Sequence, residues 1–255
     1  MLKTRIIPTL LWKDFGLVKG EAFDSWRRVG AVLPAIRVYN RRDVDELILV
    51  DITATPEGNE PDYVSVQDFA LDCMVPLTVG GGIRNIDQIR QLLSAGADKV
   101  SINTAAYDHP ELITEASDRF GVQCIISSID VKRHEDGHLS CHSHSGQTDR
   151  GLDPVEWAKK CVELGAGEIL LTSVDRDGMM NGYDIDLVKQ VSSAVNIPVI
   201  ASGGAGNYQH LIEAVKDGGA SAVALASIFH FTEATPAEAR SAMKEAGIPV
   251  RKTLK

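Results

Sequence analysis

The chain repeats its own sequence at a fixed distance. The segment VPLTVGGGIRN, residues 75–85, is matched by IPVIASGGAGN, residues 197–207, an offset of 122 positions. The apolar segments ELILVD and EILLTS, which begin at Glu46 and Glu168, match at the same offset. A repeat that spans about half of a 255-residue chain indicates two copies of one supersecondary array that bury their apolar faces together.

Short β-branched runs alternate with amphipathic helical stretches along the whole chain. Eight runs are predicted to be strands: IIPTLL, ELILVD, VPLTV, KVSIN, CIISSID, EILLTS, IPVIA and SAVALA. Such alternation predicts right-handed βαβ units and a parallel sheet that is buried on both faces. Eight units in a chain of this length are typical of a closed (β/α)8 TIM barrel.

The repeat divides this predicted barrel into two half-barrels, at about 1–120 and 121–255. No Pro/Ser-rich linker interrupts the alternation, so we expect one domain over residues 1–255. Helix-start signals support the register. Asn85 precedes an apolar helical face, and Asp153-Pro154 and Thr235-Pro236 each combine an N-cap with a proline at the first helical position.

Charge and hydropathy limit the kinds of partner. The formal net charge is −9, and no apolar run approaches the roughly 20 residues of a membrane span. An acidic chain lacks the basic surface that binds nucleic acid or anionic lipid. We therefore expect a cytoplasmic protein with neither a nucleic-acid nor a membrane partner.

Glycine clusters follow the third and seventh predicted strands. Gly80-Gly81-Gly82 and Gly203-Gly204 lie where bare backbone N–H groups can approach an anion. Either cluster alone is equally explained by a tight turn, but two at related strands favour phosphate binding. Asn103, Thr104 and Ser227 follow the neighbouring strands and would add polar groups.

Carboxylates that follow strands are the acid/base candidates, because active sites of this fold lie at the C-terminal ends of the strands. They are Asp51, Asp130, Asp175 and Asp177. Alternatively, Asp51 accepts hydrogen bonds from loop amides, and Asp175 and Asp177 belong to a solvated turn. Asp130 lies in a strongly apolar strand, which favours a perturbed pKa and a catalytic role. In the repeat, LWK at 11–13 aligns with DVK at 130–132, so Leu11 stands where the second copy has Asp130.

Four charges of alternating sign begin strands 1, 2, 4 and 6: Arg5, Glu46, Lys99 and Glu168. We expect them to form a ring of ion pairs at the bottom of the barrel. Position alone favours a structural plug, because this face usually serves stability.

A histidine-rich stretch follows strand 5, with His134, His138, Cys141, His142 and His144. The spacing matches no closed zinc site, and Asp136-Gly137 is typical of a hairpin turn. We therefore expect neither a metal nor another cofactor.

The motifs together resemble one family over essentially the whole chain. RIIP, VKG, ELILVDITAT, PLTVGGGIR, AGADKVSIN, GLDPVEWA, GAGEILLTSVDRDG, NGYD, IPVIASGGAG and ASIFHF are similar to the cyclase subunit of imidazole glycerol phosphate synthase. The resemblance implies a doubled half-barrel that takes ammonia from a class I glutaminase subunit at its N-terminal face. It also implies a substrate with two phosphates, which is split and cyclised in histidine biosynthesis.

Residue by residue, the resemblance assigns roles to positions of this sequence. It makes the four charges an ammonia gate, and Asp130 one of two catalytic aspartates. Phosphate or substrate contacts fall on Lys19, Gly81, Gly82, Asn103, Thr104, Asp177, Gly203, Gly204 and Ser227. The second catalytic aspartate belongs at Leu11, which cannot transfer a proton, and the nearby Asp14 is not expected to replace it.

Three functions remain open. A paralogue branch with a Leu-Leu-x-Lys opening resembles this chain better. That branch is associated with surface-polysaccharide gene clusters. In it, ammonia would pass to a separate synthetase that amidates a nucleotide-activated sugar. That reading is favoured here because it explains Leu11. The alternatives are the imidazole glycerol phosphate synthase cyclase itself, and a non-catalytic subunit that activates its glutaminase and binds an effector.

Overall fold

The structure, a computed structural model, describes residues 3–14 and 16–252 and has a closed barrel at its centre. Eight parallel strands close the ring, each paired with the next and the last with the first. In ring order they are β1 (Arg5–Lys13), β4 (Leu47–Asp51), β5 (Leu77–Gly80), β6 (Lys99–Ile102), β7 (Ile125–Arg133), β10 (Glu168–Ser173), β11 (Val199–Ser202) and β12 (Ala222–Leu225). The predicted (β/α)8 barrel is confirmed.

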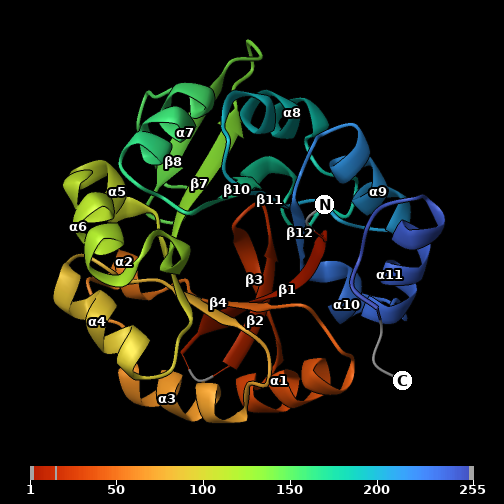
Figure 1. Cartoon of the computed structure of the whole chain (residues 1–255), viewed down its shortest axis with the longest axis horizontal. Coiled ribbons are helices and arrows are strands. Elements are labelled where there is room, and N and C mark those ends of the chain that lie inside the picture. Colours follow the sequence, from red (N-terminus) through yellow and green to blue (C-terminus); the bar gives the residue numbers. More distant parts are fainter. Residues whose placement is uncertain (1–2, 15, 253–255) are drawn as a thin grey trace.

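Helices surround the strands as an outer ring (Figure 1). They are α1 (Val32–Arg41), α2 (Ala54–Glu57), α3 (Tyr63–Asp72), α4 (Ile86–Ser94), α5 (Thr104–Asp108), α6 (Glu111–Phe120), α7 (Pro154–Glu163), α8 (Ile185–Ala194), α9 (Tyr208–Lys216), α10 (Ser227–Phe231) and α11 (Pro236–Glu245). Short 3-10 turns, η1 (Val122–Cys124) and η2 (Val174–Arg176), complete the connections. Among the described residues, no helix is long and apolar enough to cross a bilayer.

The predicted helix starts are confirmed by their caps. Asn85 accepts a hydrogen bond from the backbone N–H of Gln88 at the start of α4, and Asp153 accepts from two amides of α7. Thr235 and Glu238 form a reciprocal capping box at α11. These side chains satisfy N–H groups that the first helical turn leaves without a partner.

The sequence repeat has a structural counterpart. Leu47 N–H donates to Pro76 O at 2.9 Å, and Ile169 N–H donates to Pro198 O at 2.9 Å, the same bond 122 positions later. Asn207 caps α9 through His210 N–H, just as Asn85 caps α4. The boundary between the halves near residue 120 stays a prediction.

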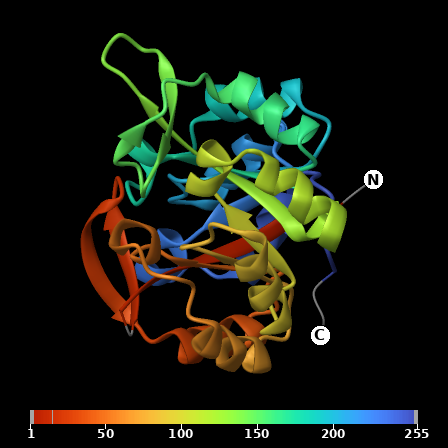
Figure 2. The same cartoon turned by 90° about the vertical axis from the view of Figure 1, so that its left-hand side faces the viewer.

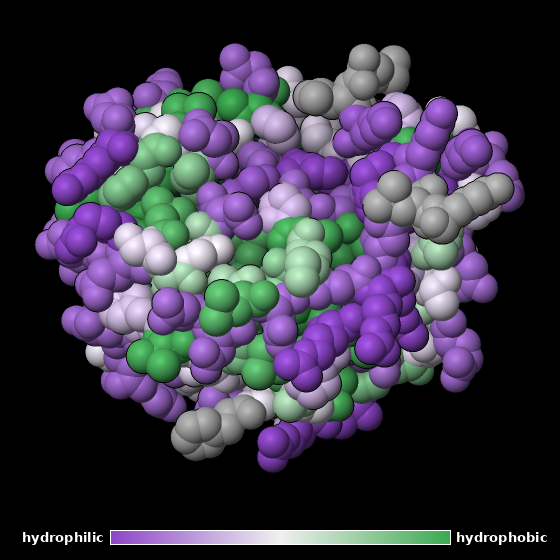
Figure 3. All heavy atoms as spheres, turned by 60° about the horizontal axis from the view of Figure 1, so that its bottom comes forward, coloured by the Kyte–Doolittle hydropathy of each residue, from purple (hydrophilic) through white to green (hydrophobic). Residues whose placement is uncertain are grey.

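Apolar side chains fill two regions. Inside the barrel, Ile7, Ile48, Ile126, Leu170, Ile200, Ala222 and Ala224 form one small cluster. A much larger cluster lies between strands and helices, and it explains why the strands read as continuous apolar runs. On the side that Figure 3 turns forward, apolar residues interrupt the charged surface; α3 exposes Val64 and Leu71, and Met74 follows it.

Two hairpins modify the simple barrel. β2 (Gly16–Glu21) and β3 (Asp24–Gly30) lie between β1 and α1, and β8 (Leu139–Ser143) and β9 (Thr148–Asp149) extend β7 as an antiparallel sheet. The turn predicted at Asp136-Gly137 is confirmed, because β7 and β8 pair on either side of it. Figure 2 shows both hairpins on the same side of the barrel.

Candidate functional site

A pocket opens at the C-terminal ends of the barrel strands. Its lining includes both glycine turns, residues 80–82 and 203–204, together with Leu11, Asp130 and Asp177. The predicted Lys19, Asn103, Thr104 and Ser227 also line it. Every residue that the sequence predicts for phosphate or substrate binding therefore borders one cavity.

The glycine turns hold backbone shapes that other residues rarely adopt. Gly81 and Gly82 have φ of 103° and 73°, and Gly203 and Gly204 have φ of 88° and 112°. A Cβ on Gly81 would lie 2.1 Å from the carbonyl oxygen of Asp51. Glycine is required at these turns, which leaves their backbone bare toward the pocket.

Two buried hydroxyls face the pocket without a partner. Ser227 Oγ and Thr9 Oγ1 are buried, and neither has a hydrogen-bond partner among the described residues. A buried polar atom without a partner costs about 1–3 kcal/mol. Both hydroxyls therefore suit a pocket ligand with several acceptor oxygens.

Asp130 is the pocket carboxylate with the strongest perturbation. It is 9% exposed, and burial, with the charge of Asp177 as a smaller cause, raises its pKa from 3.8 to about 7. Asn103 Nδ2 approaches Asp130 Oδ2 at 3.3 Å and also donates to Ser128 O at 3.1 Å. A carboxyl with a pKa near neutrality can both accept and donate a proton.

The other carboxylates are held by the chain itself. Asp51 Oδ1 accepts from Thr53 N–H at 2.9 Å and from Ala54 N–H at 3.0 Å. Bonding to loop amides is the alternative role that the sequence analysis gives this residue. Asp175 Oδ2 accepts from Arg133 N–H at 2.7 Å. Both carboxylates are therefore held by backbone N–H groups, and Asp175 does not line the pocket.

Leu11 lies opposite Asp130 in the pocket wall. It pairs with Val50 of β4 on one side and with Val18 of β2 on the other, so its position is fixed by two neighbouring strands. Asp14 does not line the pocket, and its carbonyl oxygen accepts from Trp12 Nε1 at 2.7 Å. Asp14 therefore supplies no carboxylate to this pocket.

The β2–β3 hairpin covers the pocket. Lys19 of β2 is 2% exposed and forms an ion pair with Asp177, and Ala22 N–H donates to Asp177 O at 2.7 Å. Phe23 and Trp26 from the same hairpin also line the cavity. Sequence reasoning missed these two aromatic residues, because no local pattern shows that the hairpin folds back over the barrel.

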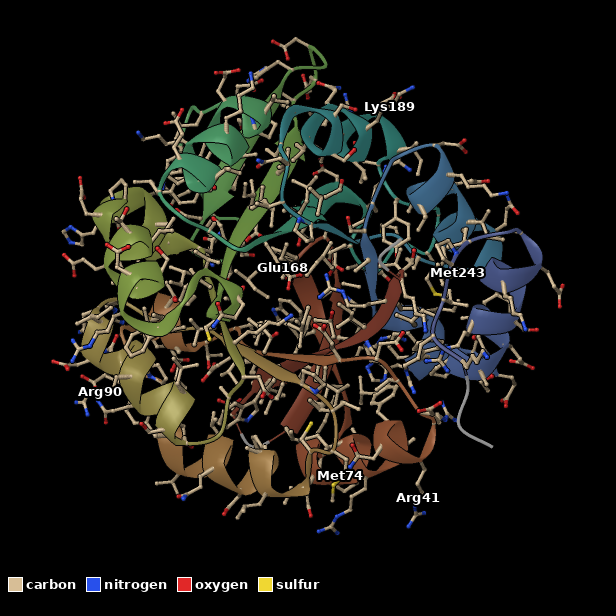
Figure 4. All side chains as sticks on the ribbon, in the orientation of Figure 1. Arg41, Met74, Arg90, Glu168, Lys189 and Met243 are labelled. Carbon is tan, nitrogen blue, oxygen red and sulfur yellow. The ribbon has the colours of Figure 1, made fainter. Side chains whose placement is uncertain are left out.

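The four charges at strand starts form a closed ring at the other end of the barrel. Arg5 contacts Glu46 at 2.8 Å and Glu168 at 2.5 Å, and Lys99 contacts the same two carboxylates at 3.1 and 2.6 Å. Figure 4 places Glu168 near the centre of the ring of helices. Burial opposes ionisation of Glu168, but hydrogen bonds and charge from Arg5 and then Lys99 outweigh it and lower its pKa.

The histidine-rich stretch lies outside this pocket, in the β7–β8–β9 sheet. His134 and His142 approach Asp149, whereas His138 stacks on His134 with ring centroids 4.0 Å apart. Cys141 is buried and free, and His144 Nδ1 bonds to Ser143 Oγ at 3.0 Å.

The sequence is similar to those of known proteins. Residues 5–235 match a family described as histidine biosynthesis protein. A Caulobacter vibrioides protein (strain NA1000 / CB15N) named imidazole glycerol phosphate synthase subunit HisF is 53% identical over 252 residues, 98% of this chain and 97% of its own length. Its counterpart from strain ATCC 19089 / CIP 103742 / CB 15 matches to the same extent.

Proposed function

The chain belongs to the histidine biosynthesis protein family, and we propose that it is a synthase barrel subunit that adds ammonia to a phosphorylated substrate. One arrangement carries this proposal: the pocket with its two glycine turns lies at the C-terminal ends of the strands, and the ion-pair ring lies at the opposite end of the same barrel.

The interior between the two ends suits ammonia. Ile7, Ile48 and Leu170 belong to the apolar cluster inside the barrel, and Leu170 also lines the pocket. Neutral ammonia crosses apolar surroundings at far lower free-energy cost than ammonium, because an unpaired ion is strongly disfavoured there. Ammonia would enter where the ring opens and react in the pocket.

The ring acts as a gate in this proposal. Its ion pairs close the entrance in the isolated chain, so a partner must rearrange them. We assign the partner as a class I glutaminase subunit docked over the N-terminal ends of the strands. The relatives from Caulobacter are named as subunits, which supports an assembly of this kind.

In this proposal, the pocket residues bind the substrate and exchange a proton with it. Residues 81–82 and 203–204, with Ser227, would hold two phosphoryl groups, and Lys19 with Asp177 would close the hairpin over the substrate. Asn103 and Thr104 would orient it. Asp130 would exchange a proton with the reacting centre, for which its pKa near 7 is suited.

The first candidate reaction is imidazole glycerol phosphate synthesis, the activity in the names of both relatives. The comparisons favour this reaction over the others. It suits the two glycine turns, but Leu11 removes one member of the acid/base pair. Loss of one such group typically costs about 10²- to 10⁴-fold in rate.

The second candidate is transfer of ammonia to another acceptor, such as an activated sugar amidated by a separate synthetase for surface polysaccharide. Leu11 is the one observation that favours it: the residue lies in the pocket wall, where the first reaction needs a proton-transfer group. Neither Caulobacter relative carries this function in its name.

One measurement separates the candidates. The purified chain is supplied with ammonium salt and the bis-phosphorylated formimino substrate of histidine biosynthesis, and product release is followed. Turnover at the rate usual for cyclase subunits establishes the first candidate. Binding without turnover, together with co-purification of a glutaminase, favours the second, and binding of neither substrate nor glutaminase contradicts the shared proposal.

A further inference from the structure

Three side chains from the β7–β8–β9 sheet converge outside the pocket. His134 directly follows β7, His142 belongs to β8, and Asp149 belongs to β9. One donor atom from each residue, a ring nitrogen of each histidine and a carboxylate oxygen of Asp149, lies within 4.8 Å of the other two. His134 Nε2 and Asp149 Oδ2 are 3.5 Å apart. Donor atoms in a tetrahedral zinc site lie about 3.3 Å apart, as follows from Zn–N bonds of about 2.0–2.1 Å.

The surrounding contacts orient these donors. Ser140 Oγ lies 2.7 Å from His134 Nε2 and 3.2 Å from His142 Nε2, so both imidazole nitrogens point to the same hydroxyl. Asp149 Oδ1 accepts from Gly151 N–H at 2.8 Å, which turns the other carboxylate oxygen toward His134. Secondary contacts of this kind orient the ligands of protein metal sites.

The three donors differ in their exposure. His142 is buried. The side chains of His134 and Asp149 are 33% and 43% exposed. The donor atoms are therefore accessible to an ion from solvent.

From this geometry we propose that His134, His142 and Asp149 bind one divalent transition-metal ion of the zinc class, with Ser140 Oγ or water as a fourth ligand. Two imidazoles and a carboxylate are ligands that zinc accepts, whereas magnesium and calcium prefer oxygen donors alone. The ion joins three neighbouring strands at the edge of the barrel. It lies close to the pocket wall, because Asn103 Nδ2 reaches both Asp130 Oδ2 and His142 O at 3.3 Å.

The test uses the untagged full chain after treatment with a chelator. Zinc is titrated by calorimetry, and cobalt by its visible absorption, which reports tetrahedral geometry. We expect saturable binding of one ion per chain and a higher Tm with zinc present. Loss of one ligand in Asp149→Asn or His134→Gln should weaken binding at least about 10-fold, because altered outer contacts alone cost 10- to 100-fold.

The matched control is Asp136→Asn. Asp136 is an exposed aspartate in the turn between β7 and β8; it bonds to His138 and lies outside the proposed ligand set. It should bind zinc as the wild type does. Absence of saturable binding, equal affinity in Asp149→Asn, or near-ultraviolet absorption from cobalt–thiolate bonds would each overturn the proposal.

Discussion

Leu11 of β1 and Asp130 of β7 face one pocket from opposite sides of the barrel, four strands apart in the closed ring. The two residues occupy corresponding positions in the sequence repeat, yet only Asp130 can exchange a proton. This asymmetry is the main constraint on the chemistry of the site.

Restoring the second acid tests that constraint. Leu11→Asp should raise ammonium-dependent turnover of the bis-phosphorylated formimino substrate by about 100-fold or more, the usual contribution of a positioned acid or base. The kcat of purified variants measures the effect. Leu11→Asn is the control of similar shape without a titrating proton. Equal rates in the two variants would contradict a role for a carboxyl group at this position.

The raised pKa of Asp130 predicts a pH-dependent stability. Because the pKa rises from 3.8 to about 7 on folding, its protonated form favours the folded state, and this stabilisation is lost as pH rises through 7. Between about pH 5 and about pH 8, the wild type should lose roughly 2–3 kcal/mol of unfolding free energy relative to Asp130→Asn. Urea unfolding of both proteins at each pH measures the difference. A constant gap would show that the carboxyl is not buried as described.

The ion-pair ring predicts a separation of two activities. Lys99→Met leaves Glu46 and Glu168 with Arg5 as their remaining ring partner. It should reduce glutamine-dependent turnover in the complex with a glutaminase while leaving ammonium-dependent turnover unchanged. Lys189→Met, at the exposed lysine labelled at the edge of Figure 4, is the control. Equal loss of both activities in Lys99→Met would indicate a structural plug instead of a gate.

The unpartnered hydroxyl of Ser227 predicts an effect on binding without an effect on folding. Ser227→Ala removes a buried oxygen that has no described partner, so Tm should stay unchanged or rise slightly. Binding of inorganic phosphate, followed by phosphorus NMR, should weaken by about 10-fold or more, since a hydrogen bond to a charged group contributes about 1.5–3 kcal/mol. Thr78→Val, at another buried unpartnered hydroxyl outside the pocket, should leave phosphate binding unchanged.

Structural features that depend on residues close in sequence were predicted well, because the patterns that indicate them are local. The eight apolar runs, the N-caps Asn85, Asp153 and Thr235, and the turn at Asp136-Gly137 depend on neighbouring side chains and on glycine conformations. The placement of the predicted phosphate residues around one pocket followed from the fold, because parallel strands bring their C-terminal ends together.

The β2–β3 hairpin was not predicted, although its residues are ordinary for a strand. Its closure over the pocket depends on contacts with distant residues, above all Asp177 and Gly178, where a Cβ would lie 2.1 Å from Gly20 O. The approach of Asp149 to His134 and His142 was missed for the same reason. It depends on the pairing of β8 with β9, and the sequence spacing of the histidines does not reveal it.

By itself, the sequence determined the eight-stranded barrel, the strand ends at which the charges and glycines lie, and the leucine at position 11, because strand periodicity and turn chemistry are properties of adjacent residues. Only the tertiary structure decided that Arg5, Glu46, Lys99 and Glu168 close into one ring, and that Asp130 has a pKa of about 7. Ion pairing and loss of solvent depend on distances between strands, and these are set when the barrel closes.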